Sequence, residues 1–464
     1  MRKTLFILLL LLLTSCGLPN NGGSKGYKEL EEGIVKIYDN KDGLPEFTAA
    51  AKKGNLEVYD IVSYYYGQSA QDFLKANFKK SKGHAEYYYA TSLIKANVQK
   101  EEARRLFEEA AKQGEYNAYY SLGSMYEEEL DYTTAISYYE KGSNKGDMFS
   151  LYAFEFLKFN KNSVNRIETL NKKYKEDKIS SDEKKELGKL VLEKFSNYDK
   201  AYEILKEFIS EDYPPALYAK AKLLQNEDKE DEAYAIFSEL HTRDKYYLGT
   251  FELAFYEVGR QNYDNALKYL EEKNYNESLI YAYKGYIYKN MKLYKKAEEN
   301  YKKAVDLKDI DALYYLGILY RDQGDLEKAR KYFESGYKLG SIPSGYDYAY
   351  ILEDIQKEKK LEKISEKDKH LDINSLGRND VSKKVYENLA KQGDFASMIN
   401  LSTYYGENSV KMKELNLIAA SRGYPVAFSN LGVYYSHHKN KTKANYWFGL
   451  AGETGKEVGK EKEK

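Results

Sequence analysis

A repeat of about 32 residues runs through most of this 464-residue chain. It is marked by alanines at intervals of 31 to 33 residues, each standing four residues before a leucine or an aromatic residue. A chain with such a period folds as a row of stacked units, because one unit cannot bury its own apolar face without a neighbour. In the middle of the chain the markers are Ala201, Ala233, Ala266, Ala297 and Ala329, and Ala103 and Ala135 stand in the same register.

Each period is predicted to hold two helices joined by a turn. Residues 310–341 illustrate this: apolar residues recur at intervals of three and four, a turn containing Gly (RDQGD) follows, and a second amphipathic stretch completes the unit. Small residues on both helices would let the backbones approach, and aromatic residues would fill the space beside them. The residues that we expect to pack this unit are Leu316, Gly317, Tyr320, Ala329 and Phe333.

The pattern Leu-Gly-x-x-Tyr followed by Ala-x-x-x-Phe resembles the tetratricopeptide repeat. A closing Ala-Ala-x-x-Gly, as in EAAKQG and AASRG, is similar to the Sel-one-like branch of that superfamily. The resemblance covers about residues 30–355 and 382–455 and implies an all-α, right-handed superhelical solenoid of about twelve helix-turn-helix repeats. The packing residues carried over from it in the other good copies are Leu122, Gly123, Tyr126, Ala135, Gly285, Ala297, Leu431, Gly432 and Ala444.

Two stretches depart from this pattern. Residues 148–200 are interpreted as keeping the period but losing the Leu-Gly pair. Residues 353–380 are dense in charge and poor in large apolar side chains, which predicts either a solvated helical extension or a flexible hinge. We therefore divide the body into a solenoid over 27–355, a charged linker or insert over 356–380, C-terminal repeats over 381–455 and a charged tail over 456–464.

The first residues are predicted to be an export signal. Arg2 and Lys3 precede an apolar run over 5–13, too short for a membrane-spanning helix of ~20 residues but typical of a signal peptide. The sequence Leu-Thr-Ser-Cys-Gly that follows resembles the bacterial lipoprotein signal. The resemblance implies that residues 1–15 are removed, that Cys16 is lipidated, and that 16–26 form a flexible tether. A plain signal peptide with a chance cysteine is the alternative.

The resemblance also indicates where in the cell the protein is located. Lipoproteins that stay at an inner membrane often carry Asp after the lipidated cysteine, whereas this chain has Gly17. We therefore expect a protein anchored by lipid in the bacterial cell envelope, at the outer membrane and facing the periplasm.

Composition argues against several function classes. Lys and Arg total 73 and Asp and Glu total 73, so no basic excess indicates a nucleic-acid partner. A single cysteine excludes a disulfide framework and a thiolate metal site. The adjacent His437 and His438 would point about 100° apart on a helix and suit one metal ion badly. No phosphate loop, nucleophile elbow or dinucleotide fingerprint occurs, so we expect no cofactor, no metal and no catalytic activity.

The 50 tyrosines are the unusual feature of the composition. If the tetratricopeptide register holds, one tyrosine per repeat would face the concave surface and form an intermittent binding ladder, with Ala282 as an exception. Packing between neighbouring helices is one alternative, and the bias of an A/T-rich genome is another. The predicted ladder residues are Tyr88, Tyr120, Tyr218 and Tyr314.

These observations favour a non-catalytic scaffold that holds a protein partner on its concave face. An alternative is a periplasmic assembly scaffold for the export of an exopolysaccharide or another envelope polymer, a role that lipoproteins with similar repeats serve. A third hypothesis, an enzyme acting on peptidoglycan, has no motif in its favour.

Overall fold

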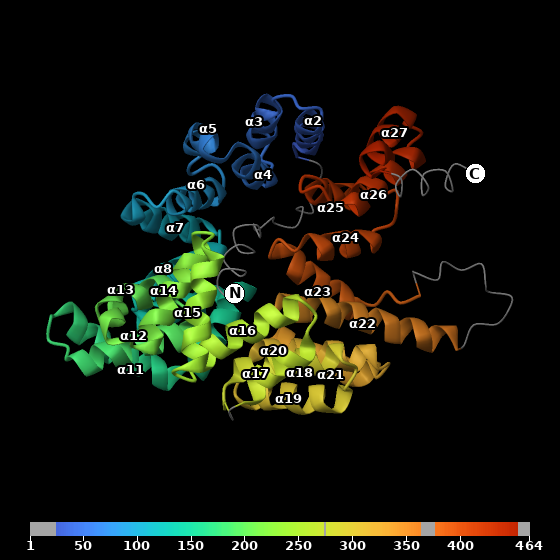
Figure 1. Ribbon diagram of the computed structural model, residues 1–464. Helices are drawn as coiled ribbons and strands as arrows, with labels where there is room; N and C mark the ends of the chain where they lie inside the picture. Colours follow the sequence, from blue (N-terminus) through green and yellow to red (C-terminus); the bar gives the residue numbers. More distant parts are fainter. Residues whose placement is uncertain (1–24, 273–274, 363–375, 453–464) are drawn as a thin grey trace. The chain divides into compact units, whose positions relative to one another are not determined.

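The computed structural model describes residues 25–272, 275–362 and 376–452, and over these residues the fold is all α with no strand (Figure 1). The predicted helical repeat fold is confirmed. The signal peptide, Cys16, most of the tether and the tail over 456–464 lie outside the described residues. Within them, no helix is both long and apolar enough to cross a membrane.

Over most of the described residues the helices alternate with short turns (Figure 1). From the N-terminal side they are α2 (Tyr27–Tyr38), α3 (Leu44–Lys52), α4 (Glu57–Tyr66), α5 (Gln71–Ala76), α6 (His84–Lys95), α7 (Lys100–Gln113), α8 (Asn117–Glu128), α9 (Tyr132–Asn144), α10 (Met148–Phe159), α11 (Lys161–Lys175), α12 (Ser181–Phe195), α13 (Tyr198–Leu205) and α14 (Pro214–Asn226). They continue with α15 (Glu230–Thr242), α16 (Tyr247–Gly259), α17 (Tyr263–Glu271), α18 (Ser278–Asn290), α19 (Tyr294–Asp306), α20 (Ile310–Asp322), α21 (Leu326–Lys338), α22 (Ile342–Leu361), α23 (Asp380–Lys391), α24 (Phe395–Thr403), α25 (Val410–Ala420), α26 (Pro425–His437) and α27 (Lys441–Leu450).

The chain divides into two compact units. The first unit contains Gly123–Glu140 and Leu151–Ser344. The second contains the described parts of Leu9–Leu122, Lys141–Ser150 and Gly345–Lys464. Residues from both ends of the chain therefore belong to the same unit.

Within a repeat, a glycine of the first helix lies against a ring of the second. A Cβ atom at Gly317 would lie 2.4 Å from the Phe333 ring, so only glycine allows this approach without a shift. The same contact joins Gly123 to Tyr139, Gly285 to Tyr301 and Gly432 to Phe448. The neighbouring packing residues are at most 1% exposed, and they are Leu122, Ala135, Ala297, Leu316, Ala329, Leu431 and Ala444.

The stretch over 181–200 is a regular repeat, which corrects its interpretation from the sequence. Leu187 and Gly188 are a Leu-Gly pair on α12. A Cβ atom at Gly188 would lie 2.3 Å from Leu205, so a leucine fills the place that an aromatic ring takes elsewhere. The departure from the pattern is therefore one side chain on α13 and not a loss of the unit.

The charged segment joins two helices that pack on each other, so of the two alternatives left open by the sequence, a linker or an insert, the packing favours the insert. α22 continues to Leu361, and its residues after 345 pack on α23. The Ser382 hydroxyl donates to the Ala349 carbonyl at 2.9 Å, and the rings of Tyr346 and Tyr386 lie 6.1 Å apart. Residues 363–375 of this segment lie outside the described residues.

Many tyrosines stabilise the array by hydrogen bonds from their hydroxyls to glutamates. Tyr320 occupies the tyrosine position of the repeat pattern and donates to Glu298 of the preceding repeat at 2.6 Å. Tyr288, one repeat earlier, donates to Glu271 in the same way. The Tyr126 ring stacks on Tyr138 at 5.5 Å. Part of the tyrosine content is therefore structural.

Candidate functional site

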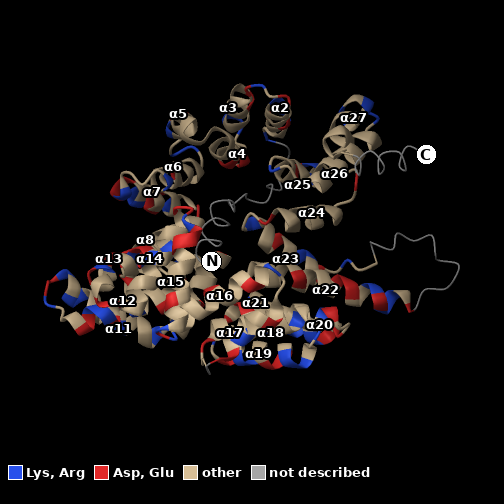
Figure 2. Cartoon of the chain, in the orientation of Figure 1, with Lys and Arg blue, Asp and Glu red and all other residues tan. Residues whose placement is uncertain are grey.

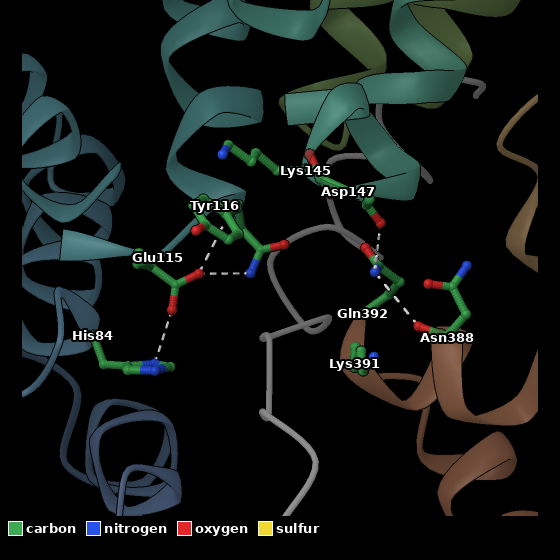
Figure 3. Close-up of a pocket in the computed structure, with 11 residues that line it drawn as sticks. His84, Glu115, Tyr116, Lys145, Asp147, Asn388, Lys391 and Gln392 are labelled. Atoms are coloured by element: carbon green, nitrogen blue, oxygen red, sulfur yellow. Dashed lines mark hydrogen bonds and ion pairs between the residues drawn. The ribbon is translucent and has the colours of Figure 1, made fainter. Parts of the chain in front are cut away.

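A cavity of about 370 Å³ lies in the second unit, where α6, α8 and α10 begin and α23 ends (Figure 3). Its walls are the turns between repeats at residues 84, 114–117, 145–147 and 388–392. Gly114 and Gly146 have φ values of 106° and 88°, which a residue with a Cβ atom rarely adopts. The volume is in the range of small-molecule sites, and the walls combine apolar surface with charged and amide side chains.

One wall is a chain of three polar side chains (Figure 3). The Glu115 carboxylate is 3% exposed and lies 2.8 Å from Nδ1 of His84. Its other oxygen accepts a hydrogen bond from the Asn117 amide at 2.7 Å. Burial alone would lower the pKa of His84, but the Glu115 carboxylate outweighs this effect and the pKa is raised. Glu115 therefore favours the protonated form of His84, so the ion pair persists to a higher pH than for a free histidine.

The opposite wall carries a second buried carboxylate. Asp147 caps α10 by accepting the backbone N–H groups of Phe149 at 3.3 Å and Ser150 at 3.0 Å, together with the Ser150 hydroxyl. Burial raises the pKa of Asp147 to about 6, although these hydrogen bonds favour the charged form. Asp147 is therefore a carboxyl group that titrates in the mildly acidic range.

Gln392 closes the cavity from the C-terminal side of the chain. Its carbonyl accepts from the Met148 N–H at 3.0 Å, and its amide donates to the Gly146 carbonyl at 3.0 Å. The side chain is 5% exposed and so is fixed in place. A residue 244 positions from Met148 thus completes the wall.

Two lysines add positive charge to the cavity. Lys145 lies over the Tyr116 ring at 5.4 Å, and Lys391 lines the end formed by α23. Neither ammonium has a carboxylate partner within 4 Å among residues 25–272, 275–362 and 376–452. The cavity can therefore hold a polar ligand that offers both acceptors and donors. In the part of the chain that the structure describes, no group of three or more His, Cys, Asp or Glu could hold a metal ion.

The raised pKa of Asp147 leads to a prediction about pH. Because burial raises the folded-state pKa above the ordinary value of 3.8, folding is favoured by this group below about pH 4, and the contribution is lost as the pH rises through about 6. The Asp147→Asn variant keeps an acceptor for the helix cap but cannot ionise. We expect its thermal midpoint to exceed that of the wild type at pH 7.5 and to equal it below pH 4, as measured by circular dichroism.

Asp325→Asn is the matched control, for which the expected change in stability at pH 7.5 has the opposite sign. Asp325 also caps a helix, α21, but the hydrogen bond and charge of Lys328 lower its pKa. This variant should therefore lose stability at pH 7.5 and match the wild type at low pH. If the thermal midpoints of Asp147→Asn and the wild type changed with pH in parallel, the raised pKa of Asp147 would be contradicted.

The four tyrosines of the predicted ladder do not form an exposed row. Tyr88 and Tyr218 are 1% and 2% exposed, and the Tyr218 hydroxyl donates to the buried Glu252 at 2.7 Å. Tyr120 is half-buried against Phe149, and Tyr314 is half-buried against Phe333. The prediction that Tyr88 and Tyr218 face a groove is wrong, because both fill space between helices.

A row of aromatic side chains, buried at Phe251 and exposed at Tyr286 and Tyr315, lies one position further along the repeat in the first unit. Phe251, Tyr283 and Tyr315 follow one another at intervals of 32 residues on α16, α18 and α20. The rings of Phe251 and Tyr283 are 5.0 Å apart, and Tyr286 stacks on Tyr283 at 5.9 Å. Tyr286 and Tyr315 are 41% and 37% exposed. We call these four residues the aromatic row; their spacing was visible in the sequence.

Three matches to family models identify the repeats. Models of the tetratricopeptide repeat match residues 96–146, 279–309 and 310–340. The chain contains tetratricopeptide repeats over these residues. The matches include the helices that carry Gly123, Gly285 and Gly317, so the glycine and ring contacts described above belong to the repeats of this family. Its repeat fold is suited to protein–protein interaction and is typically non-catalytic.

The chain is also similar to solved structures at low identity. The structure of c5321, a protective antigen of uropathogenic Escherichia coli with an SLR fold, is 18% identical, with 85% of this chain and 90% of that chain covered and a TM-score of 0.43. A Sel1 repeat protein from Oxalobacter formigenes is 18% identical, with coverage of 44% and 84% and a TM-score of 0.34. Human IFIT1 in a dimer with PPP-AAAA is 16% identical, with coverage of 86% and 94% and a TM-score of 0.33. No curated protein matches the sequence.

Proposed function

We propose that this tetratricopeptide repeat protein is a non-catalytic scaffold, held at the bacterial outer membrane by a lipid on Cys16, that binds a protein partner. The observation that carries the proposal is the aromatic row of the first unit. Tyr283 and Tyr315 recur with the period of the repeat, and the exposed Tyr286 and Tyr315 offer a rigid contact surface with a hydroxyl at its edge. Such side chains are enriched where proteins bind one another.

The anchor rests on the sequence around Cys16. A short apolar run after two basic residues, followed by Leu-Thr-Ser-Cys-Gly, supports export and lipidation. Several acyl chains on one N-terminus hold a protein stably, because a single chain gives only marginal membrane binding. The repeats would then stand in the periplasm on the tether over 16–26.

A photo-crosslinking amino acid placed in the aromatic row tests both parts of the proposal in cells. At positions 286 and 315 we expect the probe to capture the same envelope protein. The same probes in a Cys16→Ser background should sediment with membranes much less and lose most of the crosslink, because the scaffold is no longer anchored. Membrane fractionation and mass spectrometry of the captured species provide the measurement.

Position 234 is the matched control, since Tyr234 is 37% exposed on α15 but lies outside the aromatic row. A probe there should not capture that protein. Equal capture at all three positions would argue against the aromatic row as the binding surface. Unchanged membrane association of Cys16→Ser would argue against the lipid anchor.

A further inference from the structure

The two carboxylates that line the cavity of the second unit already have partners within the protein. One oxygen of Glu115 lies 2.8 Å from the His84 ring, and the other accepts from the Asn117 amide at 2.7 Å. Asp147 accepts two backbone N–H groups and a hydroxyl at the start of α10. Glu115 and Asp147 are each 3% exposed. A ligand in the cavity would therefore find few acceptors among the acidic side chains.

The two lysines of the cavity are in the opposite situation. Lys145 and Lys391 are exposed and line the cavity, and neither ammonium has a carboxylate within 4 Å in the described part of the chain. Elsewhere both signs of charge are mixed along most helices (Figure 2), and many lysines have a glutamate partner, as Lys302 has Glu298. The ammonium groups of Lys145 and Lys391 are therefore available to a ligand.

His84 adds a third cation to the walls. Its ring stacks on the Tyr59 ring with the centres 6.5 Å apart and faces Glu115 through Nδ1, so its orientation is fixed. The ring lines the cavity (Figure 3), and its other nitrogen, Nε2, makes no hydrogen bond to any described residue. Burial alone would lower the pKa of His84, but the Glu115 carboxylate raises it, so the form with a donor at Nε2 is favoured.

The charge balance of the walls favours an anion. Three of the lining side chains are cationic and two are acidic. Glu115 is balanced by His84, and Asp147 by the donors at the start of α10, whereas Lys145 and Lys391 have no such balance. Ammonium groups bind carboxylate and phosphate oxygens through charge-assisted hydrogen bonds, and this attraction strengthens where water is partly excluded.

The volume of the cavity restricts the size of the ligand. A space of about 370 Å³ is at the lower end of the range for small-molecule sites, so the ligand is a compact molecule. The amides of Asn117 and Asn388 line the same space and can form hydrogen bonds with hydroxyl groups. The ligand that fits these walls therefore combines acidic groups with other polar groups.

We propose that this cavity binds a compact organic anion that carries carboxylate or phosphate groups, held by Lys145, Lys391 and His84. Such a ligand would connect the turn before α10 to the end of α23, two segments that Gln392 already joins through hydrogen bonds. Binding would therefore stabilise the second unit. The inference goes beyond the proposed scaffold function and does not depend on the aromatic row, which belongs to the first unit.

Isothermal titration calorimetry tests the site on residues 16–464 carrying Cys16→Ser. The probes are citrate, glucose 6-phosphate and, as the neutral control, glucose, all at neutral pH and one ionic strength. We expect citrate, glucose 6-phosphate or both to bind with a Kd below about 1 mM, and glucose not to bind. Binding of citrate alone would assign the site to carboxylates, and binding of glucose 6-phosphate alone to phosphates. If neither anion bound, or if glucose bound equally well, the proposal would be overturned.

Two pairs of substitutions separate the cavity from general electrostatic attraction. Lys145→Met with Lys391→Met should weaken binding of the anion by about tenfold or more. Lys52→Met with Lys439→Met removes the same charge from exposed lysines of the second unit that do not line the cavity. This control pair should leave the Kd within about twofold of the wild type. Equal weakening by the two pairs would show that the anion does not bind in the cavity.

Asp147→Asn is a variant for which we expect tighter binding, and a gain in affinity cannot come from misfolding. The substitution removes a negative charge from the wall and keeps an acceptor for the cap of α10. The bound anion should also slow hydrogen exchange over 145–150 and 388–392 but not over 278–322 in the first unit. Weaker binding by Asp147→Asn, or unchanged exchange at the cavity, would overturn the proposal. Failed crosslinking at positions 286 and 315 would refute only the scaffold surface of the first unit.

Discussion

Replacing Arg422 with alanine will destabilise the second unit by about 3–5 kcal/mol, the cost typical of breaking a buried ion pair from one side. The substitution leaves Asp60, 2% exposed, without the guanidinium that faces it at 2.5 Å. It also removes a cation from the face of the Tyr64 ring. Urea denaturation followed by circular dichroism measures the loss, and hydrogen exchange should show faster opening of α4 and α25.

Two further variants separate the buried charge from general damage. The double variant Asp60→Asn with Arg422→Gln removes both charges. It should recover much of the lost stability, because no buried carboxylate then lacks the guanidinium beside it. Arg166→Ala breaks an exposed pair with Glu186 in the first unit and should leave the thermal midpoint nearly unchanged. A loss of less than about 1 kcal/mol for Arg422→Ala would mean that water reaches Asp60.

The packing of the two helices within a repeat could be predicted from the sequence, because it depends on residues close together in the chain. The contact between Gly317 and Phe333 follows from small and aromatic residues 16 positions apart on two helices. The same logic fails where one member of the pattern changes, as with Leu205 opposite Gly188. Composition also left open whether the charged segment is a linker or an insert, since the packing of Ser382 on Ala349 is what shows that α22 and α23 pair with each other.

The candidate cavity and the contacts between the N-terminal and C-terminal helices could not be predicted in this way. Tyr435 donates to Glu31 across 404 positions, and Gln392 bridges Gly146 and Met148 across about 245. A period in the sequence indicates which face of a helix is buried but not which distant helix covers it. The burial of Tyr218 shows the same limit, because its hydroxyl is satisfied by Glu252 of the next repeat and its exposure depends on that neighbour.

Replacing Phe333 with alanine will destabilise the first unit by about 3–5 kcal/mol, the range for removing a buried aromatic side chain. Phe333 is 0% exposed and lies against Gly317, Tyr314 and the Arg321 guanidinium. Its loss opens a cavity that Gly317 cannot fill, because glycine has no side chain. A repeat is also stabilised through its neighbours, so hydrogen exchange should rise in α19 as well as in α20 and α21. Urea denaturation provides the free energy of unfolding.

Phe333→Leu is the matched variant, because Leu205 already occupies the equivalent place against Gly188. We expect it to cost less than half as much as alanine, since a leucine fills most of the space beside the glycine. Gly317→Ala tests the other partner: its Cβ atom would lie 2.4 Å from the Phe333 ring, so overpacking should outweigh the gain in helix propensity. Gly259→Ala, at the end of α16 with no atom within 4 Å of the added Cβ, should be neutral or stabilising. A stabilising Gly317→Ala variant would show that the ring can shift and that the close approach of the two helices does not require glycine.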